Sequence, residues 1–104
     1  MVERVGRGTL QPNLTPGRRA WLERLELEGP TKRPKGPIGY QCMQLGWTDW
    51  CYELESGDRL AGAEYYALRQ PRPEAKNIGE MLTREGRRLL AQARKRESEE
   101  GGKL

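Results

Sequence analysis

The stretch "LTREGRRLLAQARKR", from Leu82 to Arg96, carries the strongest structural signal in the chain. Thr83 stands where a helix N-cap would stand, and the negative charge of Glu85 complements a helix N-terminus. One side of the projected helix collects Leu82, Gly86, Leu89, Leu90 and Ala93, and the far side collects Arg87, Arg88, Arg94 and Lys95. The pattern predicts an amphipathic helix with a basic back. The polar segment after it, residues 97–104, is predicted to be disordered.

Two more helices are predicted nearer the N-terminus. In "LTPGRRAWLERLELEGP", residues 14–30, Thr15 is a good N-cap and Pro16 occupies the first helical position. The apolar side chains of this helix, Trp21, Leu22 and Leu25, fall on one side at helical spacing. A short helix is predicted in "PIGYQCMQLG", residues 37–46, with an inner stripe of Ile38, Cys42 and Leu45.

The stretch "GWTDWCYELESG", residues 46–57, predicts a third helix from Thr48 to Glu55. Projection at the helical period gathers Trp47, Trp50, Cys51 and Leu54 on one side, which makes them candidates for the core. The other side carries Thr48, Asp49, Tyr52 and Glu53, a polar and acidic outward face. Two short helices joined at Gly46 are typical of a helix-turn-helix unit.

The segment between the third and last helices is less regular. Residues 59–69 fit either a helix or a strand, residues 71–77 read as a loop, and residues 78–82 read as a short strand. A pair of strands joined by this proline-rich loop, with Arg72 and Lys76 near its tip, would form a wing. At the other end of the chain, residues 1–13 show no sustained period and are predicted to be a flexible arm carrying Arg4 and Arg7.

The ending "EMLTREGRRLLAQAR" resembles that of winged helix-turn-helix proteins. In MarR-type regulators the second wing strand enters a closing helix through a Leu-Thr-x-x-Gly-Arg pattern, which here is Leu82-Thr83-Arg84-Glu85-Gly86-Arg87. The same ending is found in small proteins of phages and prophages, and this chain looks like one of them. The resemblance implies a mainly α fold with a small β-hairpin, built from three short helices, a wing and a C-terminal helix over residues 14–96. It also implies DNA binding through the helix after the Gly turn, with wing contacts to the backbone or minor groove.

Composition limits the chemistry that is expected. The 104 residues suit one domain, and the absence of His removes His-based triads and most zinc sites. The spacing of Cys42 and Cys51 is not Cys-x-x-Cys, and two reduced, buried thiols are predicted rather than a disulfide. No signal-like apolar region follows Met1 and no run reaches membrane-spanning length, so a cytoplasmic protein is predicted. No enzyme, metal or cofactor is expected.

Charge distribution leads to the hypothesis of double-stranded DNA as the partner. The net charge of +4 is made up of +4 over residues 1–37, −3 over residues 38–70 and +3 over residues 71–104. The candidate phosphate contacts are Arg18, Arg19, Lys32, Arg33, Lys35, Arg72 and Lys76. Base reading would fall to Thr48 and Tyr52. The middle of the chain departs from the pattern of DNA-binding relatives, because no Arg or Lys lies between Gly36 and Asp58.

The alternative is a protein-interaction module on the same fold. The acidic face of the third predicted helix, formed by Asp49, Tyr52 and Glu53, would suit a basic partner such as a host protein. The basic back of the last helix would suit an acidic partner or a homodimer contact. The carboxylates between residues 49 and 58 match no calcium loop, and acids on a solvated helix face are the ordinary explanation for them.

Overall fold

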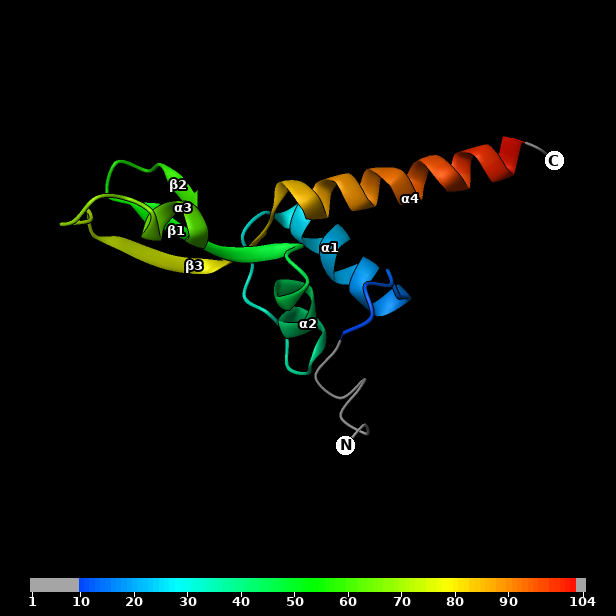
Figure 1. The fold of residues 1–104 in the computed structure, drawn as a ribbon, viewed down its shortest axis with the longest axis horizontal. Coiled ribbons are helices and arrows are strands. Elements are labelled where there is room, and N and C mark those ends of the chain that lie inside the picture. The colour runs from blue at the N-terminus through cyan, green and yellow to red at the C-terminus, as the bar shows by residue number, and fades with distance from the viewer. Residues whose placement is uncertain (1–9, 103–104) are drawn as a thin grey trace, which may run out of the picture.

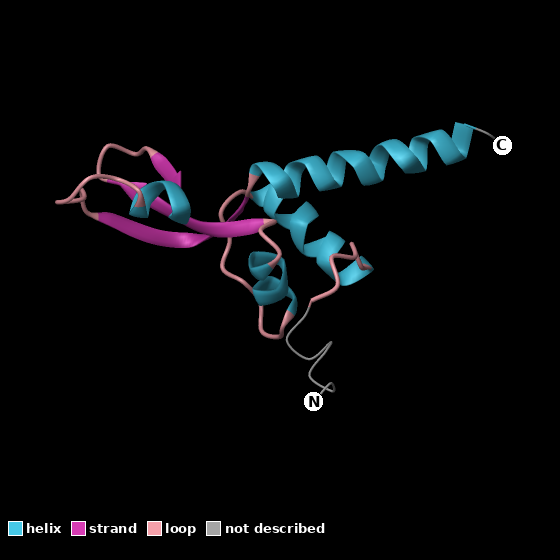
Figure 2. Ribbon diagram, viewed as in Figure 1, coloured by secondary structure: helices cyan, strands magenta, loops and turns pink. Residues whose placement is uncertain are grey.

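A computed structural model describes residues 10–102, which form four helices and a three-stranded antiparallel sheet (Figures 1 and 2). In chain order the elements are α1 (Pro16–Glu28), α2 (Ile38–Gln44), β1 (Thr48–Leu54), β2 (Arg59–Ala61), α3 (Gly62–Tyr66), β3 (Ala75–Leu82) and α4 (Arg84–Gly102). The coarse prediction of helices with a small sheet is therefore confirmed. Arg4, Arg7 and most of the predicted arm lie outside the described residues.

The first two helices form where the sequence predicts them. The hydroxyl of Thr15 accepts a hydrogen bond from the backbone N–H of Arg18 at 3.2 Å, so Thr15 caps α1, and Pro16 stands at the first helical position. Gly29, with a φ of 81°, ends this helix. The short helix α2 packs against α1 through its inner stripe, with Cys42 fully buried.

The prediction of a third helix over residues 48–55 is wrong, because this segment is the central strand β1. Its register against β3 shifts between Trp50 and Tyr52, which marks a β-bulge. The extra residue lies on β3, because Ile78 and Gly79 together stand opposite Cys51. On β1, Thr48 and Cys51 are both buried at a spacing of three, which imitates a helical pattern in the sequence.

The sheet also differs from the predicted wing. Its strand order is β2-β1-β3, so β2 and β3 pair with opposite edges of β1 and not with each other. The predicted strand at residues 78–82 is present but begins earlier, at Ala75. The undecided segment forms strand β2 and the short helix α3. The antiparallel pair β1–β3, with residues 55–74 inserted between its strands, projects from the helices in Figure 1. We call this pair of strands the wing.

A backbone bridge ties the loop after α1 to the wing. The N–H of Thr31 donates to the carbonyl of Glu80 at 3.1 Å, and the N–H of Glu80 donates to the carbonyl of Thr31 at 2.9 Å. Gly79 makes this approach possible, because it has a φ of 122° and a Cβ there would lie 2.6 Å from the carbonyl carbon of Thr31. The loop that precedes α2 is thus held against β3.

The core lies where α1, α2 and α4 meet the inner ends of β1 and β3. It consists of Trp21, Leu22, Leu25, Cys42, Trp47, Leu82 and Leu90. Burial of Trp47 and Cys51 is confirmed, whereas Trp50 and Leu54 are only partly buried. Both cysteines are free and buried, as predicted. No helix between residues 10 and 102 combines the length and apolar character that crossing a membrane requires.

The Leu-Thr-x-x-Gly motif has a structural role at the start of α4. The hydroxyl of Thr83 donates to the carbonyl of Gly46 at 2.7 Å and accepts from the N–H of Gly86 at 3.1 Å. The N–H of Thr83 also donates to the carbonyl of Trp47 at 3.0 Å. These bonds join the helix start to the turn between α2 and β1. The helix then continues to Gly102, so residues 97–102 are helical rather than the predicted disordered tail.

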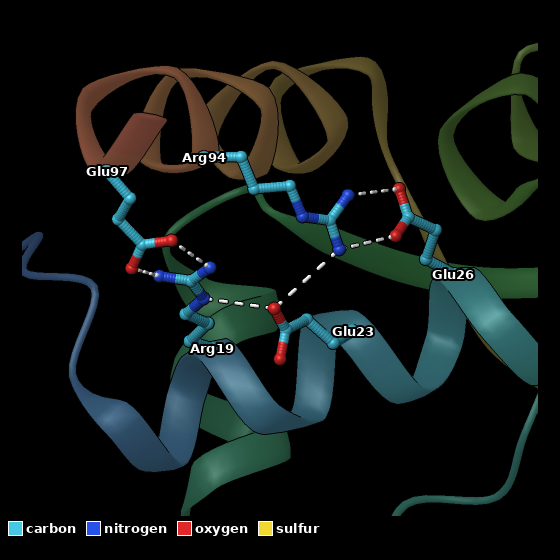
Figure 3. Close-up of polar contacts among 5 residues, drawn as sticks. All are labelled: Arg19, Glu23, Glu26, Arg94 and Glu97. Atoms are coloured by element: carbon cyan, nitrogen blue, oxygen red, sulfur yellow. Dashed lines mark hydrogen bonds and ion pairs between the residues drawn. The ribbon is translucent and has the colours of Figure 1, made fainter. Parts of the chain in front are cut away.

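Ion pairs fix α4 across α1 (Figure 3). The guanidinium of Arg94 donates to Glu26 at 2.7 and 3.1 Å, and that of Arg19 donates to both carboxylate oxygens of Glu97. Glu23 accepts from Arg19 and lies 3.6 Å from Arg94. The hydrogen bond from Arg94 lowers the pKa of Glu26, and the one from Arg19 lowers the pKa of Glu97. The arginines of this cluster therefore orient two helices.

Gly86→Ala tests the motif at the start of α4. A Cβ at this position would lie 2.2 Å from the carbonyl oxygen of Trp47 and 3.3 Å from Leu82. We expect the variant to lose about 1–3 kcal/mol of unfolding free energy or more, since the backbone must move to admit it. Urea denaturation followed by circular dichroism measures the loss. Gln92→Ala, an exposed change on the same helix, should stay within about 0.5 kcal/mol of the parent. Equal stability of both variants would contradict the close approach.

Candidate nucleic-acid interface

The structure removes two arginines from the predicted set of phosphate contacts. Arg18 is 7% exposed, and its guanidinium donates to the carbonyls of Gln11 and Asn13 at 2.6 and 2.9 Å and to the side chain of Gln41 at 3.2 Å. Arg19 is held by Glu23 and Glu97 in the cluster of Figure 3. Both side chains join parts of the fold, and neither offers a free charge to a ligand.

The predicted base-reading and acidic face does not exist. Thr48 is 2% exposed and donates its hydroxyl hydrogen to Glu80 at 3.1 Å. Asp49 accepts from the N–H of Ala63 at 3.0 Å and so holds α3, and Glu53 pairs with Arg59. Because these residues lie on a strand and not on a helix, the helical face that the sequence predicted for them is absent. Both the predicted reading helix and the predicted acidic docking face are corrected by this finding.

A different surface brings several predicted residues together. Lys32, Arg33, Trp50, Asn77, Ile78 and Gly79 line an open groove of about 700 Å³. The loop before α2 forms one wall, and strands β1 and β3 provide the rest. The bridge between Thr31 and Glu80 fixes the relative position of the two walls. We call this surface the wing groove.

Arg33 is the fixed element of the wing groove. Its guanidinium lies 4.9 Å from the ring centre of Trp50 and 6.0 Å from that of Tyr40, and it forms an ion pair with Glu80. Cation–π contacts of this kind add to the ion pair in holding the side chain. Its positive charge is balanced by Glu80, so Arg33 shapes the groove and contributes little net charge to it.

Glu80 was not predicted as an important residue. It is fully buried, and its carboxylate accepts from Arg33, from the hydroxyl of Thr48 at 3.1 Å and from the indole N–H of Trp21 at 3.4 Å. Three segments, α1, the loop before α2 and β1, are therefore joined to β3 through this one carboxylate. The only sequence signal was an acidic residue inside the short apolar strand "IGEML". Such a residue is either solvent-facing or paired, and the alternation alone does not choose between them.

The unpaired positive charge among the groove's lining residues is on Lys32. Lys35 follows in the same loop, whereas Lys76 lines a separate depression with Glu53, Glu55 and Glu74. All three lysines are exposed, and none of them forms an ion pair with a residue between 10 and 102. Lys32 and Lys35 precede α2, whose exposed Tyr40 accepts a hydrogen bond from Gln44 at 2.9 Å. Among the described residues, no acidic side chain lines the groove. The arrangement offers cations, an indole and an amide to an anionic, ring-containing ligand.

Arg72 lies apart from this surface. Its guanidinium stacks over Tyr65 and Tyr66 in the insertion between β1 and β3. Tyr52 also belongs there, since its ring stacks on Tyr65 with centroids 4.7 Å apart. A second depression, lined by Glu53, Glu55, Glu74 and Lys76 among others, follows the outer ends of β1 and β3 and is mainly acidic.

Neither a metal cluster nor a reactive thiol is found among the described residues. No group of three or more His, Cys, Asp or Glu side chains between residues 10 and 102 could hold a metal ion. Burial raises the pKa of the Cys42 thiol to about 11 and also raises the pKa of Cys51. Thiols with raised pKa values carry little thiolate near neutral pH, and the thiolate is the nucleophile. The two cysteines therefore act as small core residues.

Removing Arg33 tests the buried pair. Arg33→Ala leaves the charge of Glu80 buried without its cation, and we expect a loss of about 3–5 kcal/mol of unfolding free energy. The double variant Arg33→Met with Glu80→Gln should lose less unfolding free energy than the sum of the losses in the single variants Arg33→Met and Glu80→Gln, because no unpaired charge remains in it. Urea denaturation measures all of these free energies.

Arg59→Ala is the matched control, since it breaks the exposed pair with Glu53 and should cost less than about 1 kcal/mol. If Arg33→Ala cost no more than Arg59→Ala, Glu80 would not be the charge that joins these segments.

Comparison with known proteins identifies no family for the chain. No family model matches it, and neither does a curated protein or a solved structure. The likeness to MarR-type regulators thus rests on the motif at Leu82–Arg87, because the third helix of the expected order is strand β1.

Proposed function

We propose that this chain is a small, non-enzymatic DNA-binding protein with a winged-helix-like arrangement. In this proposal α1, α2 and α4 are the helical core, β1 and β3 are the wing, and the bridge at Thr31 stands for a first short strand. The helix next to the wing is α2, so it takes the place that the sequence assigned to residues 48–55. The protein would act in the cytoplasm, where buried thiols remain reduced.

The observation that carries the proposal is the wing groove. It combines exposed Lys32, Lys35 in the same loop and partly buried Trp50, with no acidic side chain among its lining residues. Lysine contacts to phosphates supply most of the affinity of non-specific DNA binding. Tyr40 and Gln44 on the exposed side of α2, together with Asn77 on β3, are polar groups that can reach base edges or phosphates.

The acidic residues of the middle of the chain no longer oppose this proposal. Asp49 and Glu53, which the sequence placed on the reading helix, bond within the chain at Ala63 and Arg59. The same finding removes the surface on which the protein-docking alternative depended. The exposed acids Glu55 and Glu74 lie toward the outer end of the wing, so a duplex would lie along the inner part of β3 and the loop before α2.

Binding to a labelled duplex of random sequence tests the proposal. Fluorescence anisotropy at rising salt should show weak binding with a log–log slope of about −2, because contacts of Lys32 and Lys35 with phosphates contribute about 0.9 each. Quenching of Trp50 would report occupation of the groove, since Trp21 and Trp47 are each only 4% exposed. No binding at about 50 mM salt would contradict the proposal, because non-specific binders hold DNA under these conditions.

The variant Lys32→Glu with Lys35→Glu should lose at least about tenfold in affinity. The control Lys95→Glu with Arg96→Glu changes the net charge by the same amount at two exposed positions of α4, and its loss of affinity should be much smaller. Equal losses would show attraction to the overall charge of the protein and would overturn the groove as the binding surface.

A further inference from the structure

The insertion between β1 and β3 carries a group of aromatic side chains away from the core. Tyr52 on β1 stacks on Tyr65 of α3 with ring centroids 4.7 Å apart, and Tyr66 meets the edges of both rings at 5.5 and 5.2 Å. The guanidinium of Arg72 lies 4.8 Å from the ring centre of Tyr66 and 5.8 Å from that of Tyr65. We call Tyr52, Tyr65, Tyr66 and Arg72 the tyrosine tip.

The tip is held in place by polar bonds. Asp49 accepts from the N–H of Ala63, and a Cβ on buried Gly62 would lie 2.7 Å from the same carboxylate, so α3 sits directly on β1. Glu64 accepts from the N–H of Ala61 at 2.9 Å, and the hydroxyl of Tyr65 donates to the carbonyl of Pro73 at 2.7 Å. These polar bonds fix the short helix α3 in the free protein.

Tyr66 is the exposed member of the group. Its side chain is 56% exposed, although large aromatic side chains are usually buried in cores or interfaces. Tyr66 does not belong to the hydrophobic core cluster. Arg69, close by in sequence, is exposed and forms no ion pair with a residue between 10 and 102. An accessible ring with the guanidinium of Arg72 4.8 Å from its centre is the combination that binds a base and its phosphate.

We propose that the tyrosine tip binds an unpaired nucleotide, with its base stacked on Tyr66 and its phosphate at Arg72. The inference rests on the proposed function, because the duplex that continues from this nucleotide would occupy the wing groove. Paired bases present only their edges, so a tyrosine ring can stack on a base only where the strand is single. Glu55 and Glu74 at the outer end of the wing repel phosphate and confine the strand to the side of α3.

Three labelled probes separate the two sites: a blunt duplex, the same duplex with a short single-stranded thymidine tail, and the tail alone. Fluorescence anisotropy should give at least about fivefold tighter binding to the tailed duplex than to the blunt one. Tyr66→Ala should abolish this gain and leave blunt-duplex affinity unchanged, whereas Tyr66→Phe, which keeps the ring, should retain the gain. Equal affinity of the parent for tailed and blunt duplexes would overturn the tip.

Failure of the tip and failure of the groove give different results. Tight binding of the tail alone without blunt-duplex binding would overturn the proposed function and keep the tip. Equal weakening of both duplexes by Tyr66→Ala would assign the ring to the duplex interface or to folding, and would overturn the tip.

A tail that carries 5-bromouracil tests the tip on the unaltered protein. Photo-crosslinks should map to the peptide that contains Tyr65 and Tyr66. Crosslinks that map only to other peptides, or a protein partner that competes with the tail, would contradict nucleotide binding at the tip.

Discussion

The carboxylate of Glu80 has no contact with solvent, and its partners come from α1, the loop before α2 and β1. A buried carboxylate without donors is strongly unfavourable, so the fold is stable only when Trp21, Thr48 and Arg33 all reach it. The same residue also forms the backbone bridge with Thr31. The side chain and the backbone of one strand residue thus fix where the wing meets the helices, and the position of the wing groove follows from that joint.

The ion pair between Arg33 and Glu80 has a consequence for the surface. Because Arg33 pairs with the buried carboxylate and contacts the rings of Trp50 and Tyr40, it forms a wall of the groove and is not free to bind a phosphate. The cations that remain accessible are lysines, whose flexible side chains bind phosphates as point charges without the paired geometry of a guanidinium. A surface of this kind favours backbone attraction over base selection, which suits a small protein whose sequence discrimination depends on a few polar groups on α2 and β3.

Much of the fold could be predicted where capping residues and apolar spacing agreed. Thr15 and Thr83 each mark a helix start, and the buried side chains of α1 and α4 follow the predicted stripes. The prediction failed at β1, where Trp50, Cys51 and Leu54 recur at helical spacing although the segment is a strand. The site was predicted only in part: Lys32, Lys35 and Lys76 were named and are exposed, but Arg18 and Arg19 are used inside the fold. Charge in a sequence does not reveal its partner, because ion pairs such as Arg19 with Glu97 join residues far apart along the chain.

The bulge in the wing lies on β3, where Ile78 and Gly79 together stand opposite Cys51 of β1. Gly79 has a φ of 122°, and its missing Cβ allows the backbone of Thr31 to approach β3. The bulge therefore lies at the joint where the loop before α2 meets the wing, next to Glu80. On β1, Trp50 lines the wing groove, while Tyr52 and Asp49 contact α3, so one strand holds Arg33 through an indole and also carries the tyrosine tip. Bulges are common at functional positions, and here the bulge sets the position of the loop that forms one wall of the wing groove.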